Sequence, residues 1–192
     1  DLLALAMVSP PEALAKIKTL AAEHAARASW VWATLGESPL ALAIGHLREA
    51  ADLIQTSGTP TTWDALAEDY ATRGWQVDRS VWQALAAARS SAATQAVTAA
   101  IRAIYLPWLE KFASLTQSLA ATYPTHSPQH GRTLPVAAGT VYLFADGLRF
   151  DLARSLERQL RAAGVAEHIT LTWDWSALPT VTATAKPAWQ PL

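Results

Sequence analysis

The sequence contains no cysteine. This absence excludes disulfides, iron–sulfur clusters and cysteine-based zinc sites. An excess of charge of one sign is also missing, because 15 lysines and arginines stand against 16 aspartates and glutamates, for a formal net charge of -1. Nucleic-acid-binding domains usually carry an excess of cations or a basic patch. The composition therefore argues against direct binding of nucleic acid by this chain.

Long hydrophobic runs are also lacking. No stretch approaches the roughly 18 uninterrupted apolar residues of a membrane helix. The opening DLLALAMV has neither the basic start nor the small-residue cleavage site of a signal peptide. It begins with aspartate rather than methionine, which is typical of the interior of a longer chain. We expect a cytoplasmic protein without membrane contact, of which these 192 residues are a fragment.

Helical patterning dominates residues 1–123. Ser9 and Ser38 are each followed by proline, which is typical of a helix N-cap and first turn. Apolar residues then recur at steps of three and four, as on one face of a helix. Asp78 is expected to cap a long alanine-rich segment, which Pro107 should kink or split. These signals predict an α-helical region of four or five helices.

Tryptophan is abundant, with nine residues scattered along the chain. Their spacing is typical of large anchors in helix–helix packing rather than of a base-stacking surface. His24 and His46 each stand alone in a helical pattern. We expect both histidines to be packing or surface residues.

A change of pattern follows the helical region. The stretch YPTHSPQHGRTLP carries three prolines and a glycine, which predicts a linker over residues 124–138. After it, TVYLFAD (Thr140–Asp146) is typical of a buried parallel strand. An amphipathic helix is expected over Phe150–Ala163, and a second strand over Ile169–Trp173. Strand, helix and strand form a βαβ unit, so residues 139–192 are expected to open an α/β domain.

Asp146 is the first candidate for chemistry. It lies at the carboxyl end of the expected strand, where α/β sheets gather their functional groups, and Gly147 allows a sharp exit. The alternative is that Asp146 only caps the following helix. A dinucleotide-binding loop and a P-loop are excluded because the required glycines are missing. A phosphoaspartyl hydrolase would need a second acid at the position of Leu148.

A threonine cluster supplies the second candidate group. Thr180, Thr182 and Thr184 follow Pro179. A threonine hydroxyl is a poor nucleophile unless a base or a metal lowers its pKa. No histidine lies close by in the sequence, so activation by a metal held at Asp146 is the more natural mechanism. An ordinary loop with hydroxyl–backbone bonds remains the alternative.

The two motifs together resemble the PglZ family. ADGLRFDLARSLERQL, followed at this distance by ALPTVTATAKPAW, is similar to the motifs of these alkaline-phosphatase-superfamily proteins, which are associated with BREX bacteriophage-defence systems. The resemblance covers the last quarter of the chain. The helical segment WVWATLGESPLALA is similar in kind to the region that precedes the catalytic domain in this family.

This resemblance implies a metal-dependent phosphohydrolase that acts on a phosphate ester, in the first instance a diester. It implies Asp146 as a metal ligand and Thr182 as the covalent nucleophile, with Thr180 the second choice and Thr184 the third. Lys186 and Arg149 are the candidate substrate-binding residues, each with an ordinary surface role as the alternative. The expected cofactor is a pair of divalent ions, Zn²⁺ first, with Mn²⁺ or Mg²⁺ as alternatives.

The superfamily takes further aspartate and histidine ligands from downstream of the nucleophile. One ligand and one nucleophile are too few to hold an ion tightly. We therefore expect these 192 residues alone to bind no metal stoichiometrically and to be inactive. The implied partners are other BREX-type defence proteins, among them a DNA methyltransferase. The alternative function is a non-catalytic helical scaffold within a defence complex.

Overall fold

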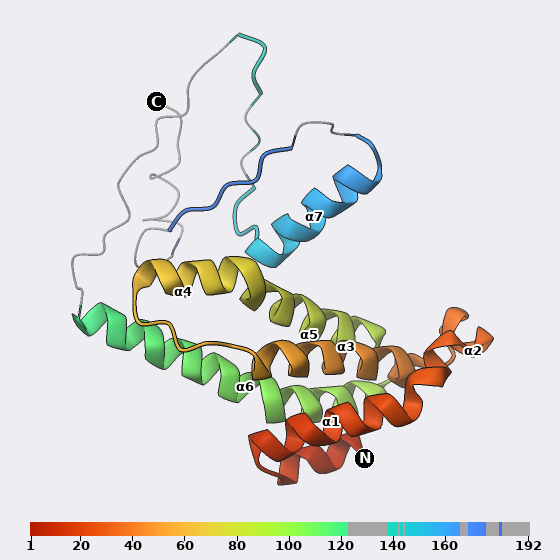
Figure 1. Ribbon diagram of the computed structural model, residues 1–192. Helices are drawn as coiled ribbons and strands as arrows, with labels where there is room; N and C mark the ends of the chain where they lie inside the picture. The colour runs from red at the N-terminus through yellow and green to blue at the C-terminus, as the bar shows by residue number, and fades with distance from the viewer. Residues whose placement is uncertain (123–137, 142, 144, 166–168, 176–180, 182–192) are drawn as a thin grey trace. The chain divides into compact units, whose positions relative to one another are not determined.

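The structure is a computed structural model that describes residues 1–122, 138–141, 143, 145–165, 169–175 and 181 (Figure 1). The chain divides into two compact units, Asp1–Leu119 and Ala120–Leu192. All regular secondary structure among the described residues is helical. None of the described helices is long and apolar enough to cross a membrane.

The first unit is an assembly of helices. Its elements are η1 (Leu2–Met7), α1 (Pro10–His24), η2 (Ala25–Ser29), α2 (Val31–Thr34), α3 (Pro39–Gln55), α4 (Trp63–Asp69), η3 (Tyr70–Gly74), α5 (Trp75–Ala87) and α6 (Ser91–Thr122), the last of which runs a few residues beyond the unit.

Two helices begin where the sequence predicts. α1 and α3 each start at a proline that follows a serine, although neither serine side chain makes a capping hydrogen bond. Proline suits this position because its missing N–H would have no partner within the helix anyway. The helical pattern of the sequence continues toward Gly36, but α1 ends at His24, and a 3₁₀ turn and the short α2 follow before that glycine. The first predicted helix is therefore broken into three elements.

The core of this unit is filled largely by small side chains. α3 packs against α1 and α5, and α6 contributes a further apolar face. Burying these aliphatic side chains removes apolar surface from water, which is the main favourable term in folding. The buried cluster is rich in alanine, and small side chains of this kind let helices approach closely. Its members from these four helices are Ala13, Ile17, Ala21, Ala43, Ile44, Leu47, Ala50, Ala51, Val81, Ala84, Ala96, Val97, Ala100, Ile101 and Ile104.

Asp78 lies inside this unit rather than at a helix cap. It is in the first turn of α5, which begins at Trp75, and only 7% of its surface is exposed. Its Oδ2 accepts a hydrogen bond from Tyr70 Oη, and its Oδ1 accepts one from Tyr105 Oη, each at 2.6 Å. Tyr70, Asp78 and Tyr105 form what we call the tyrosine–aspartate cluster. It joins η3, α5 and α6, so the prediction that Asp78 caps a helix is wrong.

Gly74 keeps Tyr70 in place. A Cβ atom at Gly74 would lie 2.5 Å from Tyr70 Cδ2, closer than real Cβ contacts. The ring of Tyr70 therefore packs directly over the glycine backbone, at the end of the π turn η3. A side chain at this position would push the phenol away from Asp78.

An aromatic row on α6 extends the cluster. The ring of Tyr105 stacks on Trp108 with centroids 5.7 Å apart, and Trp108 lies 5.3 Å from Phe112. Tyr70 meets Phe112 edge-on at 6.1 Å. Trp108 Nε1 donates to Ser57 Oγ at 3.0 Å, which ties the turn after α3 to α6. Aromatic pairs of this geometry stabilise a fold beyond what the burial of their apolar surface contributes.

The tryptophans only partly follow the predicted packing role. Trp63, Trp75 and Trp108 are buried, as helix–helix anchors should be. Trp30, Trp32, Trp82 and Trp173 are instead between 42% and 57% exposed. Trp173 lies in the predicted second strand. The sequence does not separate the other exposed tryptophans from the buried ones, because all of them lie in helical patterns.

Pro107 does not split α6. The helix runs without interruption from Ser91 to Thr122, with the proline between Leu106 and the buried Trp108. The long alanine-rich segment breaks earlier, between the end of α5 at Ala87 and Ser91. There Ser90 Oγ accepts a hydrogen bond from the N–H of Ala93 at 3.2 Å, as a capping serine does.

The second unit contains one described helix, α7 (Phe150–Ala162), which confirms the predicted helix. Gly164 follows it with a φ of +63°, in the left-handed region that favours glycine after a helix. The described residues of Thr140–Asp146 and Ile169–Trp173 are not in strands, and Val141 and Leu143 are 91% and 93% exposed. A strand needs backbone partners, and none is formed among the described residues, so the α/β domain remains a proposal. The predicted linker lies almost wholly outside them.

We predict that Asp78→Ala lowers the free energy of unfolding by about 3 kcal/mol, because it leaves two phenol hydroxyls without their acceptor. Tyr70→Phe and Tyr105→Phe should each cost about 1–2 kcal/mol in the native background and almost nothing in the Asp78→Ala background. Urea denaturation of these variants measures the coupling. Glu110→Ala, an exposed acid on α6, is the control and should change stability by less than about 0.5 kcal/mol. If the stability losses of the single variants simply add in the double variants, Asp78 is not coupled to the two tyrosines and the proposed cluster is wrong.

The environment of His46 should make the free energy of unfolding depend on pH. This half-buried side chain lies on α3, and burial lowers its pKa below 6.5, with Arg79 acting in the same direction and Glu49 opposing it. The unfolded chain then binds a proton at this residue more readily than the folded chain. Stability is therefore lost as the pH falls below about 6.5. Urea midpoints from pH 8 to pH 5 should decline less for His46→Gln than for the wild type. An identical decline in both proteins would refute the assignment.

Candidate functional site

Asp146 lies in an exposed turn of the second unit. It is followed by Gly147, whose φ of +70° falls in the left-handed region and turns the backbone ahead of α7. Within the described part of the chain, no donor or cation pairs with the Asp146 carboxylate. Neither carboxylate oxygen is taken up by another described residue.

The structure excludes a capping role for Asp146. The N-cap of α7 is Arg149, which makes no side-chain capping bond, and Asp146 lies three residues before it. A capping carboxylate would accept a hydrogen bond from an N–H in the first turn of the helix. The first-turn acid of α7 is instead Asp151. The ordinary structural explanation for an acid at position 146 is therefore removed.

Arg149 is held by a buried carboxylate. Its Nε donates to Asp151 Oδ1 at 2.9 Å, and the Asp151 side chain is only 3% exposed while that of Arg149 is 41% exposed. A guanidinium that is held through its Nε is restricted in orientation.

The threonine cluster is not placed by the structure. Thr180, Thr182, Thr184 and Lys186 lie outside the described residues. Among the residues that are described, no three histidine, aspartate or glutamate side chains gather into a group that could hold a metal ion. Asp146 is an oxygen donor of the kind that Zn²⁺, Mn²⁺ and Mg²⁺ accept, but it is a single ligand.

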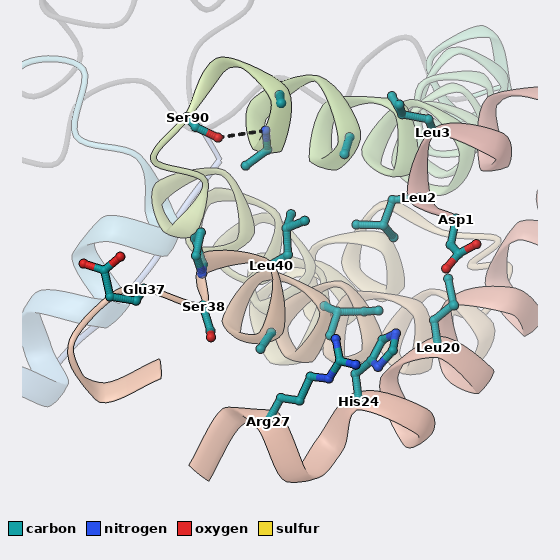
Figure 2. A pocket seen from close by; sticks show the side chains of 16 residues that line it. Asp1, Leu2, Leu3, Leu20, His24, Arg27, Glu37, Ser38, Leu40 and Ser90 are labelled. Carbon is teal, nitrogen blue, oxygen red and sulfur yellow. Dashed lines mark hydrogen bonds between the residues drawn. The ribbon is translucent and has the colours of Figure 1, made fainter. Parts of the chain in front are cut away.

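A separate pocket lies in the helical unit, where η1, the end of α1, the start of α3 and the start of α6 meet (Figure 2). Its volume is about 510 Å³. Small side chains line it near the starts of α3 and α6, among them Ala41, Ala92 and Ala93. Larger residues at these positions would fill the space.

His24 and Arg27 are the polar groups on one side of this pocket (Figure 2). His24 ends α1, and Arg27 follows three residues later in η2, with its guanidinium carbon 5.9 Å from the centre of the Trp30 ring. The sequence pattern predicts His24 as a packing or surface residue and assigns no role to Arg27. The available signal was their spacing at the end of a helix, next to a tryptophan. His46 does not line the pocket.

Comparison with known proteins identifies no relative. No protein-family model, no curated protein and no solved structure matches this chain. The resemblance to the PglZ family therefore stays a prediction that depends on the two quoted motifs.

Proposed function

We propose that this chain contributes part of the active site of a metal-dependent phosphohydrolase of the PglZ type, acting in BREX-type defence against bacteriophages. The observation that carries the proposal is the position of Asp146. Its carboxylate is exposed beside a glycine turn, caps no helix and has no partner among the described residues. Such a carboxylate has no structural task in the described unit and is free to bind a cation.

In the proposed reaction, Thr182 Oγ1 attacks the phosphorus of a phosphodiester. A bond forms between its oxygen and phosphorus while the hydroxyl proton passes to water, and the bond from phosphorus to the leaving oxygen breaks, that oxygen taking up a proton from solvent. Water then hydrolyses the threonine phosphodiester, which regenerates the threonine and releases a phosphate monoester. A divalent ion held by Asp146 would lower the pKa of the attacking hydroxyl and offset the charge of the phosphate. Arg149, oriented through Asp151, and Lys186 would bind the phosphate oxygens.

A second candidate function is an interaction scaffold for other defence proteins, including a DNA methyltransferase. The observation that favours it is an exposed apolar segment around α2. Trp30, Val31, Trp32 and Leu35 are between 49% and 62% exposed. Contiguous apolar surface of this kind often marks a protein–protein interface. The two functions are compatible, because the segment and Asp146 belong to different units.

We predict that Asp146→Asn and Thr182→Ala each lower kcat/KM for bis(p-nitrophenyl) phosphate at least about 100-fold. Each variant removes several kcal/mol of transition-state stabilisation, through the metal or through the nucleophile. The assay is run with Zn²⁺, Mn²⁺ and Mg²⁺ on the longest natural chain that contains these residues. Mass spectrometry of the quenched reaction should find a p-nitrophenyl phosphoryl group on the tryptic peptide that contains Thr182.

Two matched variants serve as controls. Glu110→Gln removes one exposed carboxylate from α6 and should retain full activity. Thr180→Ala removes the neighbouring hydroxyl and should also retain it; loss in Thr180→Ala alone would move the nucleophile to that residue. Full activity and intact phage protection in both Asp146→Asn and Thr182→Ala would refute the catalytic proposal and leave the scaffold.

A further inference from the structure

The pocket of the helical unit has an apolar floor. Leu2 and Ile44 are buried beneath it, and Leu20 and Leu40 line it with more exposed side chains. Its volume of about 510 Å³ falls in the range of roughly 300–1,000 Å³ that small-molecule sites occupy. An apolar chain or ring of moderate size would displace water from this surface and gain hydrophobic free energy.

Positive charge lies at one edge of the floor. Figure 2 shows His24 and Arg27 reaching from the end of α1 and from η2 toward the same side of the pocket. Arg27 has a permanent cation with several N–H donors, and His24 adds a further N–H donor. No ion pair to Arg27 occurs in the described residues. Its guanidinium lies over the ring of Trp30, and among the described residues no side chain bonds to its N–H groups, so these can meet an anion.

The N-termini of two helices add to the positive electrostatic potential in the pocket. The first turns of α3 and α6 both line the pocket, through Leu40 and Ala41 and through Ala92 and Ala93. Each helix carries a partial positive charge at its N-terminus. These partial charges reinforce the attraction that Arg27 and His24 supply by themselves.

Two carboxylates limit the charge of the ligand. Figure 2 shows Glu37 on one side of the pocket and Asp1 on the other, with His24 and Arg27 between them. A ligand with two or more negative charges would meet repulsion from Glu37 and from the side chain of Asp1, the latter offset in part by the α-ammonium of the same residue. A ligand with one compact negative charge can pair with Arg27 while its apolar part covers Leu20, Leu40 and Ile44.

We propose that this pocket binds an amphipathic monoanion, a carboxylate with an apolar tail, whose head pairs with Arg27 and His24. The site is independent of Asp146 and Thr182, so its test does not depend on phosphohydrolase activity. Binding would connect the end of α1 to the starts of α3 and α6. It would therefore stabilise the helical unit by mass action.

Isothermal titration calorimetry of the 192-residue chain with decanoate tests the proposal. We expect one decanoate per chain. Decyl phosphate at pH 8 and decyltrimethylammonium should each bind at least about tenfold more weakly, because the former is a dianion and the latter is a cation. Arg27→Gln should weaken decanoate binding at least about tenfold, the usual cost of losing a hydrogen bond to a charged group. Arg102→Gln, an exposed arginine of α6 that does not line the pocket, should bind as the wild type does.

A second pair of variants tests the location. Ala92→Phe fills the pocket from an exposed position and should abolish decanoate binding, while Gln95→Phe, exposed on the same helix outside the pocket, should leave it unchanged. Circular dichroism melting checks that both variants fold. If Ala92→Phe is unfolded, the comparison of Arg27→Gln with Arg102→Gln decides alone. Absence of decanoate binding, equal binding of decyltrimethylammonium, or binding that survives Arg27→Gln would overturn the proposal.

Discussion

The helical unit depends on one buried carboxyl group. Asp78 accepts hydrogen bonds from Tyr70 and Tyr105, one on each oxygen, and so joins η3, α5 and α6. A buried acid without partners would cost several kcal/mol, so the cluster is stable only in the arrangement in which both hydroxyls reach it. The alanine-rich faces of these helices fit together in many similar ways. Directional hydrogen bonds select one of them, and Gly74 keeps Tyr70 within reach.

The pocket follows from the same arrangement. Once α6 is fixed on α5, its first turn stands near the first turn of α3, and the alanines there leave space that η1 and the end of α1 close. His24 and Arg27 become neighbours of this space only because α1 ends at His24 and the 3₁₀ turn η2 follows. A continuous helix through residue 36 would present them differently. The pocket is thus a product of where helices start and stop, rather than of a motif.

Patterns of adjacent residues predicted the starts of two helices and the position of a third. The serine–proline pairs set the starts of α1 and α3, and the amphipathic pattern set α7, because these depend on a few adjacent residues. The role of Asp78 was missed, since its partners lie eight and 27 positions away in the sequence. Arg27 was missed for the same reason, because the pocket that it lines is formed by segments far apart in the sequence. For Asp146 the sequence left a cap and a metal ligand open, and the position of Arg149 at the N-cap removed the first.

Native-state hydrogen exchange tests most directly whether the tyrosine–aspartate cluster makes the helical unit one cooperative structure. Amides in the interior of α3, in α5 and in α6 from Val97 to Trp108 should exchange with the same free energy of opening, equal to that of global unfolding. In Asp78→Ala, all three sets should lose protection by the same amount. Faster, independent exchange of α6 in the wild type, or a loss of protection confined to η3 in the variant, would contradict the account.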